Sequence, residues 1–115
     1  MADGADPGDA LTILVVEDEP NLRFATAAIL RQRGYRVLSA SQGDEALSLA
    51  AAHPGDIHLL LTDVMLPGMP GPELARAVGA ERPLVRTLYV SGYTADVLAD
   101  RGLHEVVEAL LVKPF

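Results

Sequence analysis

Cysteine is absent from the 115-residue sequence, which excludes a disulfide framework, a thiolate metal site and a cysteine nucleophile. Because nothing in the composition points to an oxidising compartment, we expect a cytoplasmic protein. Long apolar runs are missing as well. The longest stretch without Asp, Glu, Lys or Arg is Ala46 to Gly55, which is too short to span a bilayer, so we expect no direct membrane contact.

Positive charge is scarce. Nine Lys and Arg residues stand against 16 Asp and Glu residues, a formal net charge of -7, so we predict no nucleic acid partner. Half of the residues are hydrophobic, which is enough for the core of one globular domain. The first ten residues lack the features of a signal peptide. We therefore expect a flexible tail over 1–10 and a folded domain over 11–115.

From residue 11 onward, short apolar runs alternate with longer amphipathic segments, the pattern of a parallel sheet wrapped by helices. Strands are predicted over 11–16, 35–40, 57–62, 84–90 and 109–112, and the nearly continuous apolar run over 11–16 is typical of a strand that is covered on both faces. Apolar residues at steps of three and four predict a first helix over 20–34, and further helices are predicted over 42–52, 72–80 and 95–101. The first helix should begin at Pro20 and stop at Gly34. Ser41 and Asp44 have the spacing of a capping box at the start of the second helix.

Polar and charged side chains follow the ends of these predicted strands. Glu17 and Asp18 follow the first strand, Asp63 the third, Ser91 the fourth and Lys113 the fifth. Each has an ordinary explanation on its own, such as a helix cap for the acidic pair. In an open parallel sheet, however, the carboxyl ends of the strands share one edge, where ligands bind. We therefore expect the five side chains to converge.

Three carboxylates in one place repel one another unless a cation neutralises them. Oxygen ligands without histidine favour Mg²⁺, with Mn²⁺ as the alternative, over Zn²⁺. A metal held by carboxylates beside an ammonium and a hydroxyl suits the binding and transfer of a phosphoryl group. Asp63 is the best candidate nucleophile because it stands alone at a central strand end, whereas Glu17 and Asp18 can share the metal.

In their order and spacing these motifs resemble the receiver domain of two-component response regulators, over residues 11–115. The matching stretches are Glu-Asp at 17–18, Thr-Asp-Val-Met-Leu-Pro-Gly-Met at 62–69, Val-Ser-Gly-Tyr at 90–93 and Lys-Pro-Phe at 113–115. The Ser-Gly-Tyr-Thr stretch most resembles receivers fused to hybrid sensor histidine kinases, so a hybrid kinase is a candidate parent chain. The resemblance implies an α/β, flavodoxin-like fold with a doubly wound parallel five-stranded sheet in the order 2-1-3-4-5.

The resemblance also implies the activity. A histidine kinase or histidine phosphotransfer protein would transfer phosphate from its phosphohistidine to Asp63 in a Mg²⁺-dependent reaction, and this would switch a protein-interaction surface. The domain would then be a phosphoacceptor of a phosphorelay and not an enzyme in its own right. The implied metal ligands are Glu17, directly or through water, together with Asp18, Asp63 and the Met65 carbonyl. The implied phosphoryl-binding groups are Ser91, Lys113 and the backbone N–H groups of Val64, Met65 and Gly92.

The sequence departs from the family at its end. Receivers normally add a fifth helix after Lys-Pro-Phe, and this sequence stops at Phe115. A fragment of a longer chain, a loss of residues or a covering subunit would each account for the difference. We expect the missing fifth helix to leave a sheet face bare, which predicts concentration-dependent self-association.

Two other classes of protein stay open on the sequence alone. An aspartate-nucleophile phosphatase usually carries Asp-x-Asp directly after its first strand, whereas this sequence has Glu17, Asp18 and Glu19 there, so this class is the less favoured. A receiver-like binding module that no longer takes phosphate is disfavoured because every charged position of the site is filled.

Overall fold

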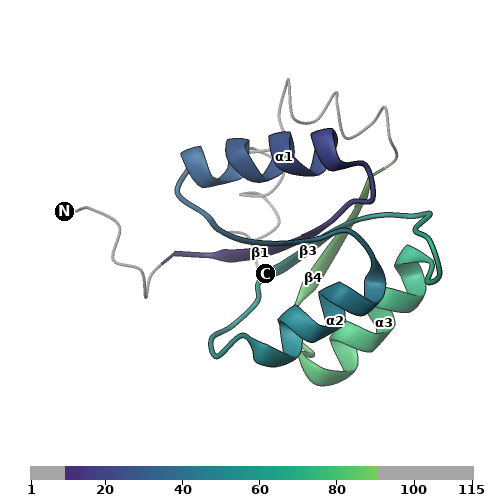
Figure 1. The fold of residues 1–115 in the computed structure, drawn as a ribbon. Coiled ribbons are helices and arrows are strands. Elements are labelled where there is room, and N and C mark those ends of the chain that lie inside the picture. The colour runs from purple at the N-terminus through teal and green to yellow at the C-terminus, as the bar shows by residue number, and fades with distance from the viewer. Residues whose placement is uncertain (1–9, 91–115) are drawn as a thin grey trace.

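Strands and helices alternate along residues 10–90, the part of the chain that the computed structural model describes (Figure 1). None of the helices in this part has the length and apolar character that a membrane crossing requires. The predicted helix over 95–101 and the predicted strand over 109–112 lie outside the described residues. The elements are β1 (Thr12–Val16), α1 (Pro20–Gln32), β2 (Arg36–Ala40), α2 (Gly43–Ala52), β3 (Leu59–Asp63), α3 (Gly71–Glu81) and β4 (Arg86–Val90).

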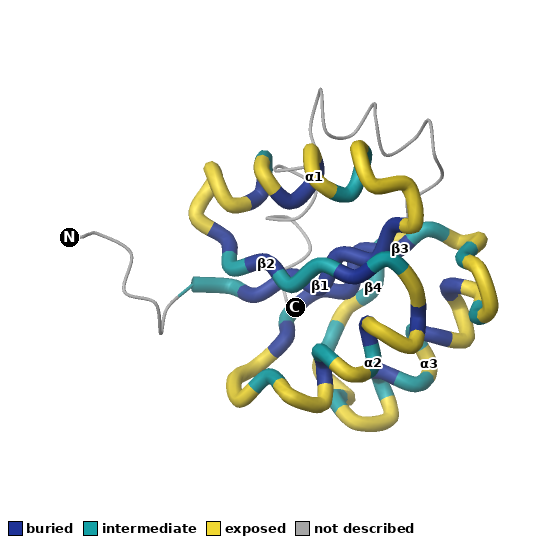
Figure 2. Tube along the Cα trace, in the orientation of Figure 1, coloured by how far each residue is buried: buried dark blue, intermediate teal, exposed yellow. Residues whose placement is uncertain are grey.

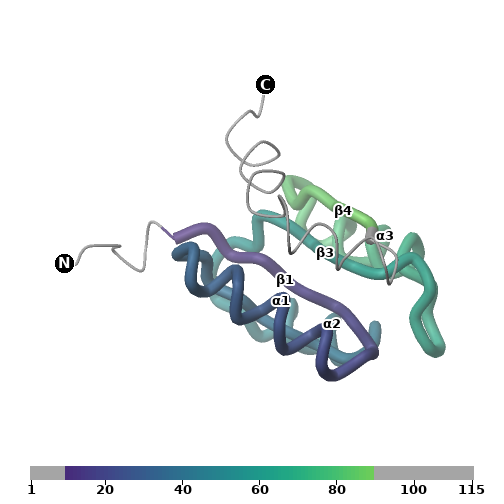
Figure 3. Tube along the Cα trace, turned by 90° about the horizontal axis from the view of Figure 1, so that it is seen from above, coloured from purple at the N-terminus to yellow at the C-terminus, as the bar shows by residue number. Residues whose placement is uncertain are grey.

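The strands form one parallel sheet in the order β2-β1-β3-β4, which confirms the predicted doubly wound arrangement for these four strands. Figure 3, in which the molecule is seen from above, shows β1, β3 and β4 side by side. After β2 the chain crosses back over β1 to form β3, so the direction of winding reverses between β1 and β3. Open α/β sheets bind their ligands at such a reversal.

Alternate residues of β1 face two separate apolar layers. Ile13 and Val15 belong to a core cluster that includes residues of α1, whereas Leu14 and Val16 belong to a cluster that includes residues of α2 and α3. In Figure 1, α1 lies on one side of the sheet and the other two helices lie on the opposite side. Figure 2 shows the buried strands β1 and β3 between helices whose outer sides are exposed. The continuous apolar run of β1 is thus explained by burial on both faces.

Local chemistry sets both ends of α1. The Oε1 atom of Glu19 accepts a hydrogen bond from the Leu22 N–H at 3.0 Å and caps the first turn. Pro20 occupies the first position of the helix, where a backbone N–H has no intrahelical partner to lose. After the helix, Gly34 has a φ of 96°, a left-handed conformation that favours glycine. The predicted start at Pro20 and the predicted stop at Gly34 are confirmed.

The predicted capping box of Ser41 and Asp44 is wrong. Gln42 is the N-cap of α2, and its side chain makes no capping hydrogen bond to the described residues. The carboxylate that reaches back belongs to Glu45, whose Oε1 accepts from the Ser41 N–H at 2.8 Å and from the Ser41 hydroxyl at 2.9 Å. The carboxylate partner is shifted by one residue because the helix begins one residue later than the box requires.

Arg82, which directly follows α3, fastens the end of α2. Its Nη1 donates to the Gly55 carbonyl at 2.8 Å, and its Nη2 donates to the carbonyls of Ala50 at 2.8 Å and His53 at 2.9 Å. The last carbonyls of a helix lack intrahelical partners, and a positive charge at this end interacts favourably with the helix dipole. Arg82 thereby joins the two helices that cover the same face of the sheet.

Replacing Arg82 with Ala removes all three hydrogen bonds. Hydrogen bonds to charged groups contribute about 1.5 to 3 kcal/mol, and we expect the free energy of unfolding to fall by about 2 to 3 kcal/mol. Urea denaturation measures the loss, with Arg76→Ala as the control because Arg76 is an exposed arginine on α3. Equal losses in the two variants would contradict the assigned role of Arg82.

Candidate functional site

The carboxyl ends of β1 and β3 lie next to each other, because these strands pair in parallel with Val16 opposite Thr62. One residue further along the chain come Glu17 and Asp63. Side chains alternate along a strand, so both acids belong to the face of the sheet that α1 covers. The sheet register therefore places an acid from each strand at the point where the winding reverses.

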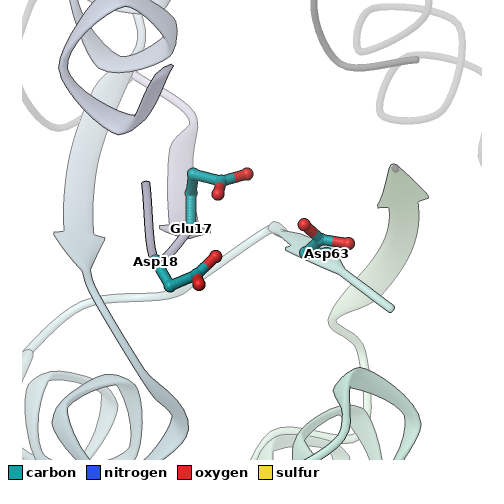
Figure 4. Close-up of side chains that lie close together, drawn as sticks. All are labelled: Glu17, Asp18 and Asp63. Atoms are coloured by element: carbon teal, nitrogen blue, oxygen red, sulfur yellow. The ribbon is translucent and has the colours of Figure 1, made fainter. Parts of the chain in front are cut away.

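The carboxylates of Glu17, Asp18 and Asp63 come together at this edge (Figure 4). One oxygen atom from each carboxylate lies within 4.8 Å of the corresponding atoms of the other two. Glu17 is buried, with 6% of its surface exposed, whereas Asp63 is half-buried and Asp18 is exposed. Three acids that the sequence places in two distant segments thus form one cluster that opens to solvent.

The cluster is electrostatically unfavourable for Glu17. Burial raises the pKa of this carboxyl above its ordinary value of 4.5, and the hydrogen bond from the Glu19 N–H acts in the opposite direction. A hydrogen bond with Asp18 and the charges of Asp63 and Asp18 raise the pKa further. A cation bound among the three carboxylates would relieve this repulsion.

Hydrogen bonds with backbone groups hold the turn that carries Glu17. Its N–H donates to the Ala40 carbonyl of β2 at 3.0 Å, and its Oε2 accepts from the Glu19 N–H at 2.9 Å. Glu19 also supplies the cap of α1, so the capping role that the sequence allowed for Glu17 and Asp18 belongs to the next residue. The acidic pair is therefore available for a ligand.

Hydrogen bonds also hold the backbone and the side chain of Asp63. Its carbonyl accepts from the Thr62 hydroxyl at 3.0 Å, and its Oδ1 accepts from the Met65 N–H at 3.4 Å. The Gly71 N–H donates to the Val64 carbonyl at 2.8 Å, which draws the start of α3 against the end of β3. A Cβ atom on Gly71 would overlap the Asp63 carbonyl oxygen, so this approach requires glycine.

The other predicted site residues divide into two groups. Val64 and Met65 directly follow Asp63, and both have exposed side chains. Ser91, Gly92 and Lys113 lie outside the described residues, so their roles stay predictions.

Two residues that support the site are not among the predicted site residues. Arg23 donates from its Nη1 to the Glu17 carbonyl at 2.8 Å, and Gly71 permits the close contact with Asp63. A signal for Arg23 existed in the sequence, because an arginine in the first turns of α1 can fold back over the preceding turn. Gly71 offered a weaker signal, since it lies among several Pro and Gly residues of the same loop.

The donor set fits a hard divalent cation. All three side chains offer carboxylate oxygens, the ligands that Mg²⁺ prefers, and the exposed Asp18 leaves the cluster open to water. Burial is the main cause of the raised pKa of Glu17, and the charges of Asp63 and Asp18 add to it; a bound cation would offset those charges.

The arrangement belongs to a known class of domain. The family model of the response regulator receiver domain matches residues 13–115, so the chain belongs to this family. It is a receiver domain of two-component signalling systems, as the order of its motifs indicated.

Curated relatives include two sensor kinases. The sensor kinase CckA of Brucella abortus (strain 2308) is 34% identical over 110 residues, which cover 96% of this chain and 12% of that protein. The sensor histidine kinase RcsC of Salmonella typhimurium is 37% identical over 113 residues, which cover 96% of this chain and 11% of that protein. The chain therefore spans a small part of the length of these relatives. The predicted likeness to receivers of sensor kinases is confirmed.

Solved structures of receiver domains are similar to this chain, in agreement with the family match. The receiver domain from the hybrid histidine kinase CckA has a TM-score of 0.60 and 38% identity, over 83% of this chain and 98% of that chain. A CheY-like receiver domain protein from Methanospirillum hungatei JF-1 has a TM-score of 0.77 and 25% identity, over 91% of this chain and 96% of that chain. The flavodoxin-like fold class is confirmed, and the comparisons favour neither the phosphatase nor the non-phosphorylated binding module.

Gly71→Ala tests the close contact between α3 and Asp63. Forcing a methyl group into a filled space costs about 1 to 3 kcal/mol, so we expect this loss of stability in denaturant unfolding. Gly79→Ala is the matched control, because Gly79 lies in the same helix and its added Cβ would meet nothing within 4 Å. The control should be neutral or stabilised by about 0.4 to 1 kcal/mol. A destabilised control and an unaffected Gly71 variant would contradict the assignment.

Glu17→Gln tests whether ionising the Glu17 carboxyl destabilises the folded state. The pKa of Glu17 is raised in the folded state, so its stabilising contribution is complete below the unfolded value of 4.5 and is lost as the pH rises through the folded pKa. Without divalent cations, we therefore expect the variant to be more stable than the wild type at neutral pH and to lose this advantage as the pH falls toward 4.5. Denaturation in the presence of a chelator measures this difference, and an equal difference at every pH would speak against it.

Proposed function

We propose that Asp63 is the phosphoacceptor of this receiver domain. The observation that carries the proposal is the cluster of Glu17, Asp18 and Asp63, in which one oxygen of each carboxylate lies within 4.8 Å of the others. Asp63 ends β3, a central strand, and its backbone is fixed by neighbouring hydrogen bonds. A nucleophile held in place in this way needs little further ordering before it reacts.

Glu17, Asp18 and Asp63 would hold Mg²⁺, together with the backbone carbonyl of Met65; Mn²⁺ is the alternative. When bound, the cation supplies positive charge that offsets the charge on the phosphoryl oxygens. A similar protein supports this choice of ion: the response regulator TrrA from Thermotoga maritima was solved in complex with Mg²⁺-BeF. It is 25% identical, with a TM-score of 0.67 over 87% of this chain and 96% of that chain.

In the proposed reaction, a carboxylate oxygen of Asp63 attacks the phosphorus atom of a phosphohistidine. A P–O bond forms, and the P–N bond breaks with its electron pair passing to the imidazole, which takes up a proton from solvent. The product is an acyl phosphate on Asp63. Glu17 and Asp18 do not react, and their role is to hold positive charge beside the incoming group.

We assign the remaining contacts to the phosphoryl oxygens to Ser91, Lys113 and the backbone N–H groups of Val64, Met65 and Gly92. A hydroxyl, an ammonium and backbone N–H groups are donors, which the acidic cluster lacks and an anionic group requires. Membership of the family and the position of these residues in its motifs support the assignment.

We infer that the phosphate donor is a histidine kinase or a histidine phosphotransfer protein. This partner must reach the carboxyl edge of the sheet, where Asp18 is exposed. We place the folded receiver domain at residues 11–115, in the cytoplasm, where it acts through protein contacts and binds neither nucleic acid nor membrane directly. The likeness to sensor kinases supports this location and this mode of action.

Asp63→Asn tests the proposal. We expect the wild type to gain one phosphoryl group from a small phosphodonor in the presence of Mg²⁺, and to gain none when the metal is chelated. Asp63→Asn should gain none under either condition, because the amide is not a competent nucleophile. Intact-mass spectrometry measures the modification.

Asp56→Asn is the matched control, because Asp56 is an exposed acid just before β3, away from the carboxyl edge of the sheet. It should be modified as the wild type is. Modification of the Asp63→Asn variant to the same extent would exclude Asp63 as the acceptor.

A further inference from the structure

Arg23 reaches from α1 back to the turn that carries Glu17 and Asp18. Its Nη1 atom donates to the Glu17 carbonyl at 2.8 Å, and the side chain is half-buried. The guanidinium is always protonated, so this is a charge-assisted hydrogen bond, which is stronger than a bond between neutral groups. The bond joins Arg23 to the backbone of the acidic turn and does not involve its carboxylates.

The Glu17 residue is held at three points. Its N–H donates to the Ala40 carbonyl at 3.0 Å, its Oε2 accepts from the Glu19 N–H at 2.9 Å, and its carbonyl accepts from Arg23. The first two contacts come from the backbone. Arg23 therefore provides the one contact of these three that a substitution can remove without altering a carboxylate or the sheet.

The turn needs such a contact because it carries like charges toward Asp63. Carboxylate oxygens within 4.8 Å repel one another, and this force pushes the turn of Glu17 and Asp18 away from Asp63. The Arg23 charge also acts on Glu45, in the first turn of α2. The Ser41 N–H and then the Ser41 hydroxyl lower the pKa of Glu45, and the Arg23 charge lowers it further.

We propose that Arg23 is a positioning residue of the cation site, whose guanidinium holds the turn of Glu17 and Asp18 at the separation from Asp63 that a divalent cation requires. The inference rests on the proposed function. It adds a residue that touches neither the phosphoryl group nor the metal and acts through the backbone of Glu17.

Two effects of removing Arg23 oppose each other. Loss of the positive charge that contacts the Glu17 carbonyl would tighten cation binding, and this effect would fade at high salt because the charge is screened. Loss of the hydrogen bond would let the turn move and would weaken binding at every salt concentration. Removing an outer group that orients metal ligands typically costs about 10-fold or more in metal affinity, so we expect the loss of position to dominate.

The test is an NMR titration of the whole chain with MgCl₂, at low and high salt, on the wild type, Arg23→Gln and Arg31→Gln. Arg31 is the matched control because it also lies on α1 and also donates to a backbone carbonyl, that of Val37 at 3.1 Å. We expect Arg23→Gln to weaken Mg²⁺ affinity by about 10-fold at both salt concentrations. Arg31→Gln should leave the affinity unchanged.

Amide hydrogen exchange gives a second measurement that does not depend on the metal. The Glu19 N–H, which donates to Glu17 Oε2, should exchange faster in Arg23→Gln than in the wild type or in Arg31→Gln. If Arg23→Gln does not fold, Arg23→Lys replaces it. This variant keeps the charge but has a shorter reach and no guanidinium fork, so it should also weaken Mg²⁺ affinity.

Unchanged or tighter Mg²⁺ binding by the Arg23 variants would overturn the role of Arg23. Equal effects of the substitutions at Arg23 and Arg31 would overturn it too, because general destabilisation of α1 would then be sufficient. These outcomes leave the proposed function intact. A wild-type chain that binds no Mg²⁺ and accepts no phosphate would instead refute the proposed function, and the inference would fall with it.

Discussion

The parallel pairing of β1 with β3 is the constraint on which the site depends. It brings Glu17 and Asp63, from segments far apart in the sequence, to neighbouring positions at one edge of the sheet. Repulsion between their carboxylates opposes this pairing at the carboxyl ends of the two strands. The apolar residues of both strands, buried on both faces, supply the free energy that holds the charged ends together.

Around this pairing, the loops are fastened mainly by backbone groups. Glu17 is bonded to β2 and to the start of α1, and the segment after Asp63 is bonded to the start of α3. The acidic side chains thus lie on turns whose backbone conformation is restricted by hydrogen bonds. A site that is ordered in advance can bind a small ion and an anionic group with a fixed geometry.

The sequence predicted the features that depend on local chemistry and on the periodicity of apolar residues. The continuous run of β1 predicted burial on both faces, and Pro20 and Gly34 predicted the ends of α1. The strand ends predicted the acidic cluster, because parallel strands necessarily place their carboxyl ends on one edge. The resemblance to receiver domains rested on the same strand-end motifs, and the family comparison agrees with it.

The rest depends on contacts that no local pattern encodes. Glu45, and not the predicted Asp44, accepts the hydrogen bond from the Ser41 N–H, because α2 begins one residue later than predicted. Sequence patterns do not resolve a difference of one residue in the start of a helix. Arg23, Gly71 and Arg82 act through backbone atoms of other segments, so their partners become evident only when the helices are placed on the sheet.

The alternation of side chains along β1 has a consequence for how this domain tolerates change in its length. Consecutive residues of the strand belong to opposite layers, and Glu17 continues this alternation at its end. Deleting or inserting a single residue within β1 would exchange the two apolar sets and turn the buried acid to the wrong side of the sheet. A two-residue change would preserve the parity of the strand, so in this segment an even change in length is less harmful than an odd one.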